Sequence, residues 1–302
     1  MVNLAVLLTC HNRKDKTTRC LCSLKESIQY YNSQNDDQLV LEIFLTNDGC
    51  TDGTVEAAQA VLPDEVSLHV IKGDGNLFWA GGMRLCWREA LKRHSEWDYY
   101  LLINDDTVMM ENLFEELFNA QEYVKEKYSV EGIVSGITCA TDDTSKLTYG
   151  GDVWVNRFLG TTRRLTPNGK PQMCDFTNAN ILLVPTKVVD KIGIFIDEFQ
   201  HGKADYDYSN TARKTGIPVV LTAHFCGCCD YDHIDEKAVA RKVTSMNLKE
   251  RKAYFSCPIH SIRDYLLLVK RTAPMRYPMA LFGRMLNLYF PKLYYRLSLR
   301  RF

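Results

Sequence analysis

The strongest constraint on the fold of this 302-residue chain is a series of short apolar runs separated by helical segments. The runs read as strands at residues 4–9, 39–46, 68–72, 99–103 and 132–137, with helix-like segments between the first four. This alternation is typical of β-α-β units, so we predict an α/β chain with a mostly parallel central sheet and helices on both of its faces. Ligands of such sheets bind at the carboxyl ends of strands, and we therefore look for chemistry in the polar segments that follow them.

The pattern changes after about residue 136. Thr-, Gly- and Asn-rich pieces predict hairpin-like structure near residues 149–152 and 166–169, because Asn-Gly tolerates positive φ and proline sets one φ angle. A helix is predicted over residues 205–214, ending at Gly216. The last sixty residues, rich in Leu, Tyr, Met and Arg, predict a helical C-terminal tail.

Charge and cysteine content exclude several classes of protein. The 37 basic and 37 acidic side chains leave no overall field to attract a polyanion, so nucleic acid is not an expected partner. The 11 cysteines are scattered and follow no cleavable signal, which favours a reducing cytoplasm over a disulfide scaffold. The apolar opening, residues 2–8, is far shorter than the roughly 20 residues that cross a bilayer.

Polar residues directly follow the first two predicted strands. Thr9 and Asn12 lie in the first cluster, and Asp48 in the second is followed by glycine and a helix start. A carboxylate at this place can accept hydrogen bonds from a ribose or base while the helix N-terminus faces phosphate; the alternative is an ordinary capped turn. The absence of a G-x-G-x-x-G or P-loop motif counts against dinucleotide-binding dehydrogenases and P-loop enzymes.

The fourth predicted strand runs straight into Asn104, Asp105 and Asp106. Carboxylates at the end of a buried strand are costly unless a cation or hydrogen-bond donors satisfy them. Oxygen ligands of this kind suit Mg²⁺ or Mn²⁺, which keep coordination positions for substrate phosphates. The alternative is a solvated turn.

A third acidic cluster contains Asp205 and Asp207 at the start of a predicted helix. Capping of that helix would account for both side chains, since carboxylates are stabilised at helix N-termini. If one of them faces a bound sugar, it can instead accept the proton of an attacking hydroxyl as a general base.

In order along the chain, these segments resemble the family 2 glycosyltransferases, inverting nucleotide-sugar enzymes with the Rossmann-like GT-A fold. The resemblance covers residues 2–220 and extends to bacterial polysaccharide-assembly members such as rhamnosyltransferases. The matching pieces are TCHNR at residues 9–13, LTNDGCTDGT at 45–54, GDGNLFWAGGM at 73–83, LLINDDT at 101–107, and IGIFIDEFQHGKADYDYSNTARKTG at 192–216.

The resemblance implies roles for particular residues. Thr9 and Asn12 would border the nucleobase, and Asp48 would bind base or ribose. Asn104, Asp105 and Asp106 correspond to the D-x-D element, in which Asp106 would hold the metal with help from Asp105. Residues 73–84 correspond to the loop that closes over the nucleotide and supply the further donor-binding candidates Gly75, Asn76, Trp79, Gly82 and Arg84.

Departures from the family pattern leave two points open. Ala204 replaces the acid that commonly precedes the base, so either Asp205 or Asp207 could be the base. Arg84 stands where Asn is common and could contact phosphate. Family analogy also offers His224 as a ligand of the metal or the diphosphate, against the alternative that residues 224–230 form a buried loop.

The sequence thus predicts a metal-assisted, inverting transfer from a UDP- or dTDP-linked sugar to a glycan or lipid-linked acceptor in bacterial surface polysaccharide synthesis. The rivals are a nucleotidyltransferase and an inactive sugar-binding module on the same fold. We expect residues 1–230 to form the catalytic domain, with a nucleotide-binding half (1–107) and an acceptor-side half (108–230). Residues 231–302 form a helical extension whose basic, apolar tail predicts peripheral contact with the anionic inner face of the plasma membrane; an ordinary packing helix is the alternative.

Overall fold

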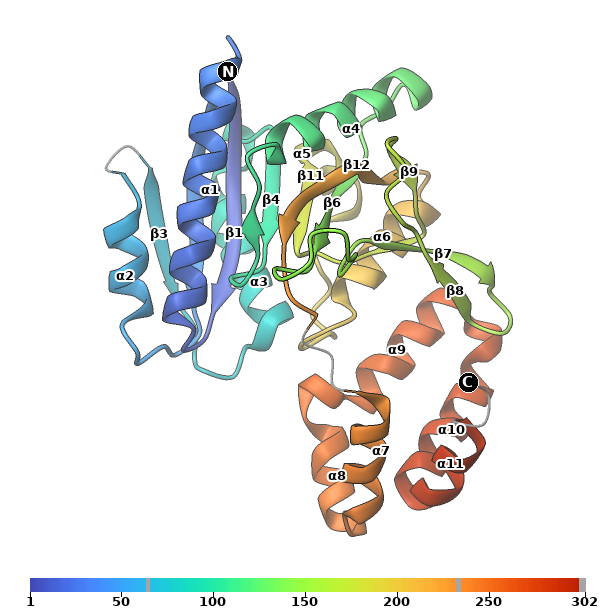
Figure 1. Ribbon diagram of the computed structural model, residues 1–302. Helices are drawn as coiled ribbons and strands as arrows, with labels where there is room; N and C mark the ends of the chain where they lie inside the picture. The colour runs from blue at the N-terminus through green and yellow to red at the C-terminus, as the bar shows by residue number, and fades with distance from the viewer. Residues whose placement is uncertain (64–65, 232–234, 299–302) are drawn as a thin grey trace.

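The computed structural model describes residues 1–63, 66–231 and 235–298. Within them a nine-stranded sheet has the order β3-β2-β1-β4-β11-β6-β12-β5, with β9 paired to β12 (Figure 1). The strands of this sheet are β1 (Val2–Cys10), β2 (Leu39–Asn47), β3 (Ser67–Lys72), β4 (Tyr99–Ile103), β5 (Val108–Met109), β6 (Ile133–Cys139), β9 (Gln172–Met173), β11 (Ile181–Pro185) and β12 (Val219–Cys228). Strands β3, β2, β1 and β4 are parallel, as are β6 and β12, which confirms the predicted sheet.

Helices cover both faces of the sheet, as predicted. One face packs against α1 (Lys14–Gln34), α2 (Thr54–Val61) and α4 (Leu113–Tyr128), and the other against α3 (Phe78–Ala90), α5 (Thr186–Ile192) and α6 (Ala204–Lys214). The 3-10 helix η1 (Leu91–Glu96) continues α3. Because side chains alternate along a strand, β1 sends Leu4, Val6 and Leu8 to the first core and Ala5 and Leu7 to the second.

A second, three-stranded sheet has the order β10-β7-β8, with β7 (Gly151–Asn156), β8 (Thr161–Arg164) and β10 (Phe176–Thr177). The predicted hairpin is β7–β8, which residues 149–152 lead into. The turn at residues 166–169, where Gly169 has a φ of 76°, does not close a hairpin. It carries the chain from β8 to β9, which pairs with β12 of the large sheet.

The predicted helical tail is present. It comprises α7 (Glu236–Ser245), α8 (Leu248–Ser256), η2 (Pro258–His260), α9 (Ile262–Thr272), η3 (Pro274–Arg276), α10 (Tyr277–Tyr289) and α11 (Pro291–Ser298), drawn in orange and red in Figure 1. The last residues of the predicted basic tail, 299–302, lie outside the described residues. Nowhere in the described chain is a helix both long enough and apolar enough to span a bilayer.

The direction of β11 decides which segments meet at the edge of the sheet where β1, β2 and β4 end. β11 runs antiparallel to β4, with Ile181 opposite Ile103. Its start, and not its end, therefore lies at this edge. Residues 178–180, which precede β11, are brought beside residues 104–106, which follow β4; the backbone N–H of Asn104 donates to the carbonyl of Asn180 at 3.1 Å.

Candidate active site

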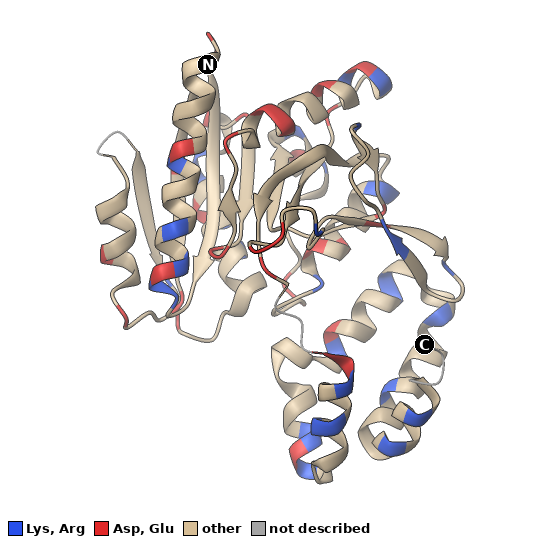
Figure 2. Cartoon of the chain, in the orientation of Figure 1, with Lys and Arg blue, Asp and Glu red and all other residues tan. Residues whose placement is uncertain are grey.

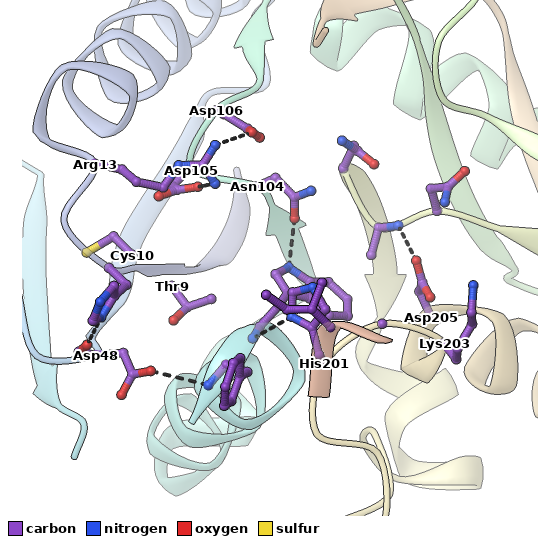
Figure 3. Close-up of a pocket in the computed structure, with 18 of the residues that line it drawn as sticks. Thr9, Cys10, Arg13, Asp48, Asn104, Asp105, Asp106, His201, Lys203 and Asp205 are labelled. Atoms are coloured by element: carbon purple, nitrogen blue, oxygen red, sulfur yellow. Dashed lines mark hydrogen bonds and ion pairs between the residues drawn. The ribbon is translucent and has the colours of Figure 1, made fainter. Parts of the chain in front are cut away.

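A cavity of about 630 Å³ opens at this edge of the sheet (Figure 3). Its walls come from the ends of β1, β2 and β4, the start of α3, residues 178–180, residues 201–206, Tyr149 and Ile259. Eight of the residues that the sequence analysis selected line it: Thr9, Asp48, Gly75, Trp79, Asn104, Asp105, Asp106 and Asp205. Segments as far apart in the chain as Asp48 and Asp205 therefore contribute carboxylates to one cavity.

Asp48 organises the loop between β3 and α3. Its carboxylate is almost fully buried and accepts the backbone N–H groups of Gly75 at 2.8 Å, Leu77 at 3.0 Å and Phe78 at 3.2 Å. Gly73 lies so close to Asp48 that an added Cβ would overlap the carboxylate. Asp48 thus fixes the loop that the resemblance places over the nucleotide, and its Oδ1, which accepts only the Gly75 N–H among these amides, keeps a second lone pair for a ligand.

Arg13 bridges the two aspartates that follow β4. Its guanidinium lies 3.0 Å from Asp105 Oδ1 and 2.5 Å from Asp106 Oδ2, and Lys16 Nζ is 3.9 Å from the same Asp106 oxygen. Burial raises the pKa of Asp105 to about 7, although the positive charge of Arg13 opposes that shift. Positive and negative groups therefore alternate along this wall.

Trp79 joins the donor loop to the opposite wall. Its indole N–H donates to Asn104 Oδ1 at 2.7 Å, and its backbone N–H donates to His201 Nδ1 at 3.4 Å. Burial lowers the pKa of His201, which favours the neutral imidazole, the form that can accept this hydrogen bond. The ring of Phe78 meets His201 edge to face, with centroids 6.1 Å apart.

Asp205 lies in the first turn of α6, on the side of the cavity opposite Asp106 in Figure 3. Its Oδ2 accepts the backbone N–H of Ala179 at 3.4 Å and its Oδ1 accepts that of Tyr206 at 2.9 Å. Burial raises the pKa of Asp205, opposed by these amides and by Lys203. A carboxylate with a raised pKa is a stronger base, so Asp205 has the chemistry to accept a proton.

Two non-glycine residues that line the cavity have backbone in the left-handed region. Phe78 has a φ of 54° and Lys203 a φ of 80°. This conformation costs about 1–3 kcal/mol for a non-glycine residue and persists where the surroundings hold it. Asp48 supplies the restraint at Phe78, and the turn into α6 supplies it at Lys203.

Four selected residues support the walls without lining the cavity. Asn12 accepts the backbone N–H of Thr51 at 2.8 Å, and the backbone N–H of Asn76 is bound by Asp74. Gly82 packs on Thr9, where an added Cβ would overlap the hydroxyl. Arg84 is buried and donates to backbone carbonyls, to that of Ile196 at 3.0 Å and to that of Phe199 at 2.6 Å.

Asp207 and His224 also lie outside the lining of the cavity. Asp207, two residues after Asp205 in α6, is buried, and its carboxylate pairs with Arg271 of α9 at 2.5 Å. His224, whose side chain is 63% exposed, pairs with Glu116 of α4 at 2.8 Å. The geometry therefore separates Asp205, which reaches the cavity, from Asp207, which ties the C-terminal helices to α6.

The cavity contains residues that the sequence analysis did not select as site residues. Arg13 stands in the quoted TCHNR motif, and residues 201–203 stand in the quoted segment before Asp205, so their motifs gave a signal. Asn178, Ala179 and Asn180 gave none, because they reach the site only through the reversed direction of β11. Ile259 comes from η2 in the C-terminal helices.

The carboxylates after β4 fit a divalent cation in one specific way. Oxygen ligands suit Mg²⁺ and Mn²⁺, and Mg²⁺ sites commonly use one or two carboxylates together with substrate phosphates. In the described chain no three His, Cys, Asp or Glu side chains come together as a metal cluster. Asp106, with Asp105 beside it, therefore fits a cation whose coordination the substrate completes. The thiols of residues 226–229 form no such cluster either, and all eleven cysteines are free.

The family model described as glycosyl transferase family 2 matches residues 5–183, more than half of the chain. The chain belongs to glycosyl transferase family 2. It is a glycosyltransferase, an enzyme that moves a sugar from a nucleotide sugar. A search of curated proteins found no match.

Among solved structures, the chain is similar to a mannosyltransferase from Pyrobaculum calidifontis in complex with GDP-Man and Mn²⁺. The TM-score is 0.50 at 12% sequence identity, and the match covers 95% of this chain and 70% of that chain. At this identity the likeness concerns the fold. The glycosyltransferase therefore has the expected GT-A architecture, with its cavity at the carboxyl ends of the parallel strands.

Proposed function

We propose that this family 2 glycosyltransferase inverts the configuration of the transferred sugar in a single displacement, with Asp205 as general base. The observation that carries the proposal is that Asp106 and Asp205 line one cavity from different walls. A single displacement needs neutralisation of charge where the diphosphate leaves (the departing side) and a base where the acceptor hydroxyl attacks (the attacking side). Asp106 suits the first place and Asp205 the second.

The departing side is the wall after β4. Arg13 and Lys16 bring positive charge to Asp106, and Asp48 holds the loop at residues 73–78 through its backbone amides. A Mg²⁺ or Mn²⁺ ion held by Asp106 with Asp105 would neutralise charge on the departing diphosphate. The guanidinium of Arg13 can serve the same phosphates directly, because its planar fork matches their oxygens.

The attacking side is the wall at the start of α6. Asp205 takes the proton of the acceptor hydroxyl while the hydroxyl oxygen bonds to the anomeric carbon. The bond from that carbon to the nucleoside diphosphate breaks in the same step. Among the carboxylates that line the cavity in the described chain, Asp48 lies at the end of β2 and holds the donor loop, while Asp105 and Asp106 follow β4 and pair with Arg13, so all three belong to the departing side. This leaves Asp205 as the base, and its raised pKa suits that role.

The acceptor side is built by the second half of the chain. We divide the enzyme into a donor half (1–107), an acceptor half (108–230) and a C-terminal extension (231–302). Tyr149 lines the cavity from the acceptor half, and Ile259 lines it from the extension. Asp264 of α9 accepts the backbone N–H of Gln200 at 3.1 Å, so the extension also positions the segment that leads to Asp205.

For the substrates we propose a UDP- or dTDP-linked hexose or deoxyhexose, rhamnose included, and a glycan or lipid-linked acceptor of bacterial surface polysaccharide synthesis. The corresponding place is the cytoplasmic face of the plasma membrane. Motif resemblance to polysaccharide-assembly enzymes supports this setting. GDP sugars belong in the same screen, because the similar mannosyltransferase was solved with GDP-Man.

The experiment is a screen of UDP, dTDP and GDP sugars with Mn²⁺ by thermal stabilisation, followed by product analysis with the donor that binds. A ligand that binds the folded state raises the melting temperature. The proposal expects release of nucleoside diphosphate and an anomeric configuration opposite to that of the donor. Release of pyrophosphate, or retention of configuration, would refute it.

A further inference from the structure

The C-terminal helices carry an unusual concentration of exposed apolar side chains. Met275 is 78% exposed, Phe282 67% and Leu297 53%. Single exposed apolar residues are common on proteins, whereas a group of them marks a surface that contacts something. We call the "apolar face" the surface of η3, α10 and α11 formed by Met275, Met279, Phe282, Met285, Leu293 and Leu297.

The apolar face is distinct from the side of α10 that packs on the protein. Ala280 and Asn287 of α10 are buried and turned inward. Phe282 and Met285 follow helical spacing on the outward side, where polar residues would stand on an ordinary surface helix. The outward stripe therefore lacks a partner within the described chain.

A second segment extends the apolar face. At the tip of the β7–β8 hairpin, Val155 and Phe158 are each 64% exposed and Leu159 is 54% exposed. Gly160, with a φ of 66°, lies against η3 so closely that an added Cβ would overlap the guanidinium of Arg276. Figure 1 shows the hairpin tip beside these helices. Two apolar segments far apart in the sequence thus lie together.

The charge around the apolar face is positive. No Asp or Glu occurs after Asp264, whereas Arg276, Lys292 and Arg296 lie in η3 and α11. Figure 2 shows basic residues and no acidic ones on α10 and α11. The hairpin adds Arg157, whose side chain is 64% exposed, although its guanidinium lies 3.7 Å from Asp175. A second copy of this chain would bring like charges together, so the charge favours an anionic occupant.

We propose that the apolar face and the β7–β8 tip dock on an anionic lipid bilayer, with the apolar side chains in the interface and the cations against acidic headgroups. Both docking segments are connected to residues that line the cavity. Ile259 of η2, in the same C-terminal extension, lines it, and Asp152 of β7 accepts the hydroxyl of the lining residue Tyr206 at 3.2 Å. Docking would hold the cavity beside the bilayer; the link to a lipid-linked acceptor rests on the proposed function, whereas docking itself does not.

The test is flotation of the full-length protein with vesicles of phosphatidylcholine alone or with about 30% phosphatidylglycerol. We expect binding to the anionic vesicles that weakens in high salt. Phe282→Glu and Phe158→Glu should each reduce partitioning at least about tenfold, since each places a charge in the apolar interface. The matched control is Val130→Glu, a 46% exposed valine in the loop after α4, which should bind as the parent does.

A variant that lacks two cations tests the proposed contact with acidic headgroups. Lys292→Gln with Arg296→Gln should lower binding to anionic vesicles about fivefold for each cation removed and leave binding to neutral vesicles unchanged. None of the substituted residues lines the cavity, so the nucleotide sugar should still raise the melting temperature of every variant. Loss of vesicle binding with intact nucleotide binding would support docking, and failure of nucleotide binding in the parent would count against the proposed function alone.

Two results would overturn the proposal. One is a parent protein that does not float with anionic vesicles. The other is a parent dimer, seen by analytical ultracentrifugation, that Phe282→Glu converts to a monomer while vesicle binding stays absent. The second result would assign the apolar face to contact between copies of the chain.

Discussion

The two walls of the cavity differ in how the chain builds them. The donor wall comes from consecutive β-α units, in which β1, β2 and β4 are parallel and end at one edge. The opposite wall comes from residues 178–180, residues 201–206 and Ile259, which are far apart in sequence. A repeated unit thus places the charged groups of the donor wall, whereas long-range packing places the groups of the opposite wall.

The walls also differ in how their carboxylates are held. Asp105 and Asp106 face cations, Arg13 first among them. The carboxylate of Asp205 accepts hydrogen bonds from two backbone amides, and burial raises its pKa. We infer a division of labour in which the donor wall neutralises a diphosphate and the opposite wall receives a proton.

The largest expected effect comes from removing the base. Asp205→Asn should lower the transfer rate about 10³-fold, because general bases contribute about 10²–10⁴-fold, and should leave the donor Kd nearly unchanged. Initial rates and calorimetry with the same donor measure the two quantities. The control is Asp207→Asn on the same helix, which should keep transfer within about threefold at a temperature where it is folded. If the two variants had the same transfer rate, Asp205 would not be the general base.

Removal of the donor-wall carboxylate should have the next largest effect. Asp106→Asn should lower transfer about 10²-fold and raise the Mn²⁺ concentration needed for half-maximal rate, because a ligand is lost on the departing side. A titration of the rate with Mn²⁺ measures both changes. Asp142, an exposed loop residue outside the cavity lining, gives the matched control Asp142→Asn. A rate that chelators do not change would contradict metal assistance at this wall.

The pH dependence of kcat/KM should report the raised pKa of Asp205. A general base must be deprotonated, so with Asp205 in the proposed role kcat/KM should fall about tenfold per pH unit below its pKa. Burial raises that pKa, while Lys203 and two amides lower it, and the net shift is upward. The acid limb should therefore lie above the ordinary aspartate value of about 3.9. It should remain in Asp207→Asn and shift in Asp205→Glu; an acid limb at or below the ordinary value would argue for another base.

The smallest effect on catalysis, but a clear one on stability, is expected at Asp207. Asp207→Asn leaves Arg271 without its buried partner and should lower the free energy of unfolding by about 2 kcal/mol, or Tm by about 5 °C. Thermal unfolding measures the change. Arg271→Gln added to Asp207→Asn should recover part of the loss, because no unpaired charge remains. A Tm unchanged in the single variant would mean that the pair does not anchor α9.

The sequence could predict the donor wall because local patterns reach it directly. A strand followed by polar residues located Asp48 and Asp106 at the same edge, since parallel strands end together. The resemblance added Asp205, which lines the same cavity. The sequence could not distinguish Asp205 from Asp207, because both lie in the first turn of α6. They differ in that Asp207 pairs with Arg271 of α9, a contact that no local pattern reveals.

Other contributions had no local pattern to reveal them. Residues 178–180 enter the site because β11 runs against its neighbours, and Ile259 enters because the extension folds back onto the domain. His224 and Arg84 carry side chains suited to phosphate, yet Glu116 and backbone carbonyls hold them elsewhere. Residue type alone therefore could not distinguish a ligand from a structural contact.

The most direct measurement is a crystal structure of the Asp205→Asn variant with Mn²⁺ and the nucleotide sugar that the screen identifies. We expect the diphosphate to lie against Asp106 and Arg13, and the anomeric carbon to lie between that wall and residue 205. A nucleotide sugar bound outside this cavity, or a sugar whose reacting face turns away from residue 205, would contradict it.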